Sequence, residues 1–150
     1  MTFTTEVLAG FTSPNQLVML FKILFGGLLG FTIGWNRRAS VAGIRTFTLI
    51  AIGATVFTIV SVSGFPNNSP NADQARIIAQ IVTGVGFLGV GVIWKHKGRL
   101  TGMTTAATIW IAAAIGISVG IGMFSTAVIV TALTLLLLNL KPWLVRFEED

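Results

Sequence analysis

At 150 residues the chain is long enough for one domain, and its composition excludes an ordinary soluble fold. Hydrophobic residues make up 53% and charged residues 10%, with a mean hydropathy of +0.85, whereas soluble domains carry about 25% charged residues. We therefore expect a polytopic membrane protein, whose net charge of +5 reflects membrane topology rather than nucleic-acid binding, and whose lack of cysteine excludes disulfides and thiolate metal sites.

The first sixteen residues differ from the rest because they are polar or mixed. They contain Glu6 and lack the basic and apolar regions of a cleavable signal peptide, so we expect them to remain as an extracytoplasmic segment, 1–16. A transmembrane domain is expected over 17–140 and a short cytoplasmic tail over 141–150. The first span is predicted over about 17–35, close to the ~20 residues that cross a bilayer.

Small residues mark one face of the first span. Gly26, Gly30 and Gly34 recur every four residues, which places them along one side of a helix and predicts a close helix contact. Lys22 lies near the entry end of this span. Its ammonium group either extends to the lipid head groups or belongs to a pore or substrate site.

Two further spans follow, each next to a basic loop. The second is predicted over about 46–62 and the third over about 77–94, and the turn-forming run 63–71 separates them. One basic loop, 36–46, precedes the second span, and another, 95–99, follows the third.

The last apolar segment is too long for one crossing. Residues 100–140 contain no charged residue, and 41 residues of helix would be roughly 60 Å long, about twice the hydrocarbon thickness. Glycines between 116 and 122 and Ser125 indicate a turn. We predict a fourth span over about 105–121 and a fifth over about 125–140.

Five crossings sort the basic residues by side. Eight of the ten fall on one side, and only Lys22 and Arg76 fall on the other. By the positive-inside rule, the N-terminus then lies outside and the C-terminus in the cytoplasm, which predicts an all-α, multi-pass bundle in the bacterial inner membrane. Trp35, Trp94 and Trp143 fall at the cytoplasmic boundary, as interfacial aromatic residues do.

The third span is the richest in glycine. We expect it to be the central helix, packed on several sides through Gly84, Gly86, Gly89 and Gly91, because small residues let membrane helices approach closely.

Polar side chains form a strip at the entry to this span. Asp73, Arg76, Gln80 and Thr83 follow one another at roughly helical spacing. Asp73 either caps the helix and pairs with Arg76, or forms with it a polar vestibule that meets an ion or partner. Gln80 and Thr83 either bond a neighbouring helix or face a cavity.

The cytoplasmic loops supply the other candidates. The arginines of the first loop either determine topology or form an anion or lipid-headgroup site, to which the Asn36 side chain and the loop backbone would contribute. Two threonines before the fourth span either cap that helix or join this group. The candidate residues are Asn36, Arg37, Arg45, Thr46, Thr104 and Thr105.

Catalytic and metal-ligating side chains are scarce. Outside the tail the chain has only two carboxylates, Glu6 and Asp73, so no paired-carboxylate, HExxH or Ser/His/Asp arrangement can be drawn. We expect a protein that is not an enzyme and has no cofactor. Mg²⁺ is expected at most as a weakly bound hydrated ion at Asp73, since a dehydrated ion requires more oxygen ligands. His96 is interpreted as an interfacial loop residue.

Four blocks of the sequence resemble the MgtC/SapB family of bacterial inner-membrane proteins. They occur in that family's order and cover roughly residues 20–123. The family usually has an acidic residue where Asn36 stands and a proline where Gln74 stands, and its longer members carry a soluble C-terminal domain. The blocks are Gly27–Gly30 with Gly34–Arg37, Ala42–Thr46, Asp73–Ile93, and Gly102–Trp110 with Ala113–Gly116.

The resemblance implies an integral inner-membrane protein linked to magnesium homeostasis or growth at low Mg²⁺. In the virulence branch it implies an inhibitory contact with the membrane sector of ATP synthase. Our leading hypothesis is a non-enzymatic protein that acts through contacts within the membrane. The partner would be a second copy of the chain, in a homo-oligomer, or a membrane protein such as the membrane sector of ATP synthase or a magnesium transporter. We expect no nucleic-acid partner. The alternatives are a small channel or transporter that uses the polar strip, and a purely structural membrane component.

Overall fold

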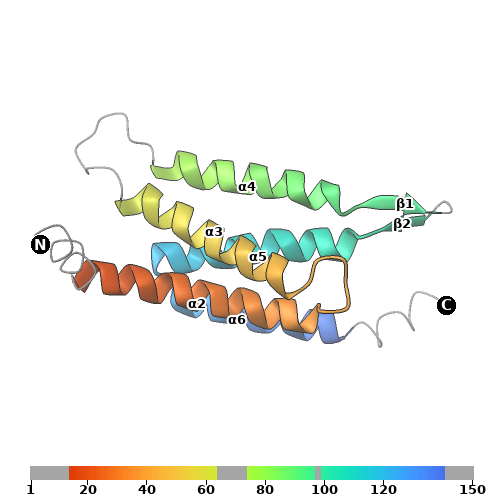
Figure 1. Cartoon of the computed structure of the whole chain (residues 1–150), viewed down its shortest axis with the longest axis horizontal. Coiled ribbons are helices and arrows are strands. Elements are labelled where there is room, and N and C mark those ends of the chain that lie inside the picture. Colours follow the sequence, from red (N-terminus) through yellow and green to blue (C-terminus); the bar gives the residue numbers. More distant parts are fainter. Residues whose placement is uncertain (1–13, 64–73, 97–98, 141–150) are drawn as a thin grey trace, which may run out of the picture.

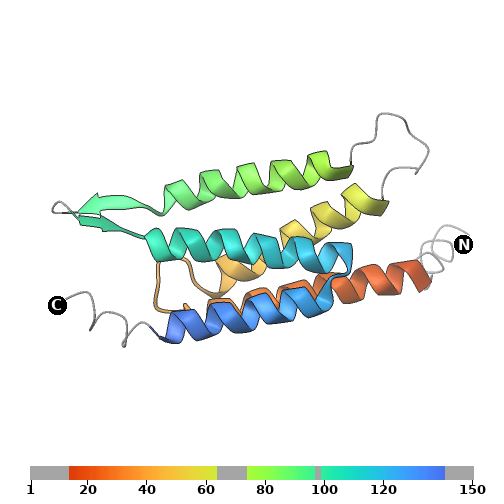
Figure 2. The same ribbon diagram turned by 180° about the vertical axis from the view of Figure 1, so that it is seen from behind.

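A computed structural model describes residues 14–63, 74–96 and 99–140. In these residues five helices lie side by side along one long axis, and a small hairpin extends from one end (Figures 1 and 2). The helices and strands are α2 (Pro14–Asn36), α3 (Ile44–Ser63), α4 (Gln74–Gly91), β1 (Trp94–His96), β2 (Arg99–Thr101), α5 (Met103–Ile121) and α6 (Phe124–Asn139). The prediction of a helical bundle is confirmed.

Three of these helices are long and apolar enough to cross a membrane. They correspond to residues 15–36, 44–63 and 103–121, with mean hydropathies of 2.0, 1.9 and 1.7. Helices α4 and α6 are apolar but shorter. Many large apolar side chains on all five helices are exposed, as expected for surfaces that face lipid rather than water.

The centre of the bundle is the pair α3 and α5. Small residues of one helix face the backbone of the other, so that a Cβ added at Gly116 would collide with the Ala51 carbonyl oxygen, and one at Gly120 would lie 2.5 Å from Thr58 Cβ. The Thr55 hydroxyl lies 2.8 Å from the Ala51 carbonyl oxygen of its own helix and 3.0 Å from the Gly116 carbonyl oxygen of α5. Close backbone approach, rather than large side chains, therefore builds this interface.

The glycines of α2 all face α3. A Cβ added at Gly30 would lie 2.7 Å from both Ala51 Cβ and the Phe47 carbonyl oxygen, and one at Gly34 would lie 2.6 Å from Ile44 Cα. At Gly26 an added Cβ would collide with the hydroxyl of Thr55. The four-residue spacing thus corresponds to a line of close contact along α2.

The position of α4 corrects our expectation of a central helix. Among the described residues this helix packs mainly against α5 and α3, at one edge of the bundle (Figure 1). Val85 and Gly89 are buried on its inner face, whereas the Phe87 side chain is 81% exposed on the other side. A high glycine content does not distinguish a helix enclosed on all sides from one with an uncovered face.

The chain after α4 also differs from prediction. The helix ends at Gly91, and Trp94 begins an antiparallel hairpin in which Trp94 pairs with Thr101. The cap of the next helix is Gly102, with a φ of 89°, where an added Cβ would collide with the Val92 carbonyl oxygen. The interpretation of Thr104 or Thr105 as the helix cap was therefore wrong, because α5 begins before both.

Candidate functional site

Basic side chains gather at one end of the bundle. The end of α2, the start of α3, the hairpin and the end of α6 all lie there, whereas the start of α2, the turn between α5 and α6 and the start of α4 lie at the opposite end (Figure 1). We call the first end the basic end. Its described cationic side chains are Arg37, Arg38, Arg45 and Lys95.

Arg37 joins the end of α2 to the start of α5. Its Nη2 donates a hydrogen bond of 2.6 Å to Oγ1 of Thr105, a residue only 5% exposed. The Nε atom of the same guanidinium is buried and has no hydrogen-bond partner. Burial lowers the pKa of Arg37 from its ordinary value, because desolvation disfavours the charged form. Two residues predicted as separate loop candidates are therefore in direct contact.

Asn36 lies beside the end of α6. Its Nδ2 donates to Oδ1 of Asn139 at 2.9 Å, which connects two helices far apart in the sequence. Our sequence reasoning did not select Asn139. An amide in the otherwise apolar run before residue 140 was the signal that could have identified it.

Arg45 and Thr46 line a small cleft at the start of α3. Together with Arg38, Gly43 and Ile44 they enclose about 310 Å³. Arg38 crosses from the α2–α3 connection and also lies over the Trp35 ring, 5.5 Å from its centroid. Thr104 is exposed and does not line this cleft.

The polar strip of α4 is exposed in the part of the chain that the structure describes. Arg76, Gln80 and Thr83 are all exposed, and the Thr83 hydroxyl donates within its own helix, to the Ala79 carbonyl oxygen at 3.2 Å. Asp73, which we predicted as part of this strip, lies outside the described residues.

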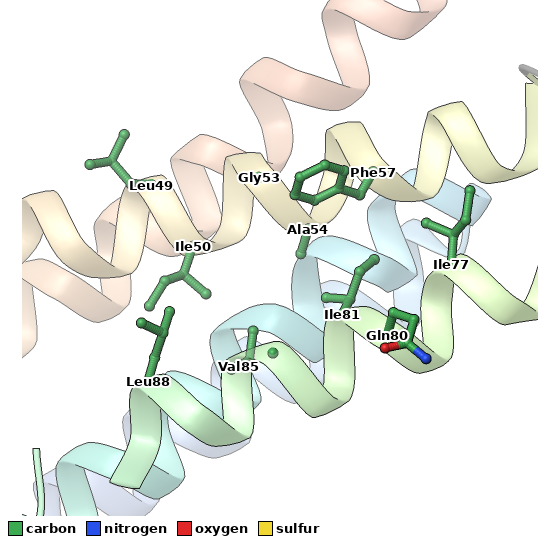
Figure 3. A pocket seen from close by; sticks show the side chains of 11 residues that line it. Leu49, Ile50, Gly53, Ala54, Phe57, Ile77, Gln80, Ile81, Val85 and Leu88 are labelled. Carbon is green, nitrogen blue, oxygen red and sulfur yellow. The ribbon is translucent and has the colours of Figure 1, made fainter. Parts of the chain in front are cut away.

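Gln80 also lies on one wall of an apolar groove between α3 and α4. The groove has a volume of about 530 Å³ and contains one polar side chain, that of Gln80. Figure 3 shows Ile81, Val85 and Leu88 of α4 on the side toward α3. Gly53 and Gly84 line opposite walls, and a Cβ at either position would meet nothing within 4 Å.

The other glycines of α4 are mostly uncovered. An added Cβ at Gly86 or Gly91 would likewise meet nothing within 4 Å, and one at Gly89 would be 3.7 Å from Ala106 Cβ, an ordinary van der Waals distance. Of the four glycines we predicted to pack, only Gly89 lies against another helix of this chain.

Lys22 is held at the opposite end. Its ammonium group donates to the Gly120 carbonyl oxygen at 2.8 Å, near the C-terminal end of α5, where a cation is favoured by the helix dipole. The Lys22 side chain is partly buried.

The part of the chain that the structure describes has no cluster of metal-ligating side chains. All five carboxylate residues lie at positions outside it, and no group of three His, Asp or Glu side chains occurs within it. The prediction of a hydrated Mg²⁺ ion at Asp73 therefore stays a prediction.

Comparison with known proteins identifies relatives over most of the chain. Residues 23–147 match the MgtC family. The chain is 43% identical over 122 residues to Protein MgtC of Salmonella typhimurium, covering 81% of this chain and 50% of that protein. It is 44% identical over 108 residues to Protein MgtC of Brucella abortus, covering 72% and 43%. No solved structure matches.

A longer match is to an uncharacterized protein of Haemophilus influenzae, 37% identical over 149 residues, which covers 94% of this chain and 63% of that protein. The chain spans about half the length of the curated relatives it matches. The family match covers α2 from residue 23 onward and the whole of the other four helices described above. Together with the apolar helices, it shows that this membrane protein belongs to the MgtC family.

Proposed function

We propose that the protein is a non-enzymatic component of magnesium homeostasis that acts through helix contacts within the inner membrane. Its membership of the MgtC family supports the link to magnesium. The observation that carries the proposed mode of action is the outer face of α4, where polar side chains and Gly86 are exposed and no other described residue covers them.

Lipid tails cannot satisfy the polar groups of this face. In the described residues the Gln80 amide has no hydrogen-bond partner, and neither lipid tails nor apolar side chains can supply one. Gly86 leaves room for a second helix to approach the α4 backbone. A second copy of the chain or another membrane protein, such as the membrane sector of ATP synthase or a magnesium transporter, would supply that helix.

Bulk added to this face tests the proposal. In a deletion strain grown at limiting Mg²⁺, Gly86→Leu and Gln80→Leu are expected to rescue growth less well than wild type at equal membrane abundance. Gly86→Leu meets open space in its own chain, so it should leave the fold intact. Ala132→Leu, which adds a similar side chain to an exposed position on α6, is the matched control. Equal rescue by all three variants would reject the α4 face as the contact surface.

The proposed topology has five crossings, with the N-terminus outside and the C-terminus in the cytoplasm. The gathering of Arg37, Arg38, Arg45 and Lys95 at one end supports this orientation. Because the chain has no cysteine, single cysteines can report it directly. In intact spheroplasts a membrane-impermeant maleimide should label Met123→Cys and leave Ala39→Cys unlabelled. The reverse pattern would invert the topology.

A second candidate function is ion passage along the outer face of α4. Arg76, Gln80 and Thr83 favour it because all three are exposed along that helix. In this arrangement the pathway would form between copies of the chain. Purified protein in liposomes would be assayed for Mg²⁺, proton and anion flux. Loss of flux in Gln80→Leu would support a channel, and no flux above protein-free liposomes would exclude it.

A further inference from the structure

Three neighbouring clefts at the basic end share lining residues along α2. The first, about 310 Å³, contains Arg38, Arg45 and Thr46. The second, about 520 Å³, shares Arg38 with the first and extends past Asn36 and Asn139 to Trp35 and Thr32. The third, about 390 Å³, shares Trp35 and Thr32 with the second and continues to Phe31. We call this series the headgroup groove.

The polarity of the groove changes along its length. Its outer part has two guanidinium groups and a hydroxyl, its middle part has two amides, and its inner part is formed by Phe31, Thr32 and Trp35. The rings of Phe31 and Trp35 are tilted at 36° to one another with centroids 5.8 Å apart, and both residues belong to the last turns of a candidate membrane span. The groove thus runs from the membrane boundary into the hydrocarbon region, with charge at one end only.

Among the described residues, the cations of the outer part have no carboxylate partner. No carboxylate side chain occurs among the residues that the structure describes. The Arg38 side chain has one hydrogen bond, from Nη1 to the Trp35 carbonyl oxygen at 3.4 Å, which leaves most of its donors available. The neighbouring Arg37 adds a third positive charge. An anion in the outer cleft would relieve this repulsion.

Phosphate fits these donors. Guanidinium groups bind its oxygens in pairs. The start of α3 adds backbone donors for an anion. The first hydrogen bond of that helix runs from the Phe47 amide to the Gly43 carbonyl oxygen, so the amides of the preceding turn have no acceptor within the helix. The total volume and the apolar continuation provide room for more than an inorganic ion.

From this arrangement we propose that the headgroup groove binds an anionic phospholipid, with its phosphate between Arg38 and Arg45 and its glycerol and first acyl carbons along Trp35 and Phe31. This site is independent of the outer face of α4 and does not require the function proposed above. Its ligand is a lipid rather than a free phosphate compound because the neighbouring clefts lead to the exposed apolar side chains of Phe31 and Trp35 on α2.

Binding is tested on the full-length protein in a neutral detergent. Short-chain phosphatidylglycerol, short-chain phosphatidylcholine and inorganic phosphate are titrated separately, with bound lipid counted by native mass spectrometry and affinity taken from the shift in thermal unfolding. We expect saturable binding of phosphatidylglycerol at least about tenfold tighter than that of phosphatidylcholine, because the site donates charged hydrogen bonds to a net anion.

Two variants distinguish a specific binding site from nonspecific electrostatic attraction of anionic lipid to the basic end. The double variant Arg38→Gln/Arg45→Gln removes both guanidinium groups from exposed positions and is expected to weaken phosphatidylglycerol binding about tenfold or more. Lys95→Gln removes one charge at the same end without touching the groove and should change the affinity less than about twofold. Circular dichroism verifies that the variants keep their helix content.

Three outcomes would overturn the proposal. The first is equal binding of the anionic and neutral lipids. The second is equal weakening by Lys95→Gln and the double variant, which would mean diffuse electrostatics. The third is inorganic phosphate that binds as tightly as phosphatidylglycerol and displaces it, which would identify a free phosphate compound as the ligand.

Discussion

Adding one methyl group to α2 at Gly30 should weaken the fold. In Gly30→Ala the new Cβ would lie 2.7 Å from Ala51 Cβ and from the Phe47 carbonyl oxygen, and 3.1 Å from Thr48 Cα. Favourable contacts between carbon atoms begin near 3.5 Å, so α2 and α3 would have to separate by about 0.8 Å. Two of the three contacted atoms belong to the backbone and cannot rotate away.

The expected magnitude follows from overpacking in tightly packed interiors. Such substitutions cost about 1–3 kcal/mol, which corresponds to a five- to 150-fold change in the folding equilibrium, on the scale of about 1.4 kcal/mol for each factor of ten. Gly53→Ala is the matched control, because its Cβ would meet nothing within 4 Å. The control should be neutral or stabilised by up to about 1 kcal/mol, since alanine favours helix more than glycine does.

The assay is equilibrium unfolding in mixed micelles, with sodium dodecyl sulfate as denaturant and far-ultraviolet circular dichroism as the signal. Gly30→Ala should unfold at a lower detergent fraction than wild type, and Gly53→Ala at the same fraction or higher. If Gly30→Ala were as stable as wild type, or if both variants were destabilised equally, close packing of α2 on α3 at this glycine would be refuted.

Three other substitutions test individual contacts by the same unfolding measurement. Thr105→Val removes the hydrogen-bond acceptor of Arg37 and should lower the free energy of unfolding by about 1–3 kcal/mol, because a partly buried cation loses its partner. In a double-mutant cycle with Arg37→Met, the double variant should lose less stability than the sum of the two single variants, and strict additivity would contradict the contact. Lys22→Met removes the donor to the Gly120 carbonyl oxygen and should lower the free energy of unfolding by about 1 kcal/mol, whereas Lys22→Arg keeps a donor and should lower it less. Equal stability of the two variants would count against the hydrogen bond. Gly102→Ala should destabilise by at least about 1 kcal/mol, because the added Cβ combines a φ of 89° with a backbone collision; an unchanged midpoint would argue against this turn.

Much of the bundle could be predicted because its signals are local. The spans predicted over 17–35, 46–62 and 105–121 correspond to α2, α3 and α5, whose observed bounds differ by three residues or fewer at each end. The turn before the last helix followed from length alone, because one helix of 41 residues would exceed the membrane. Family membership also followed from short blocks of sequence and is confirmed.

The arrangement of the candidate residues could not be predicted in the same way. Arg37 and Thr105 are 68 positions apart, and Asn36 and Asn139 are 103 apart, yet each pair is in hydrogen-bond contact. Nothing in the local pattern of either segment specifies such a partner. Likewise, Arg38 was interpreted only as a determinant of topology or as part of a general anion site, and its place between two clefts depends on how α2 and α3 meet.

The glycines show where sequence and tertiary structure divide. By itself, the sequence determined that this chain enters the membrane as apolar helices, because hydrophobicity and helical length act along the chain. It also placed Gly26, Gly30 and Gly34 on one side of a helix, but it could not tell those buried glycines from the uncovered Gly84 and Gly86. Only the tertiary structure decided that α3 and α5 form the centre and α4 the edge, because a glycine's environment depends on which distant backbone comes within contact distance of it.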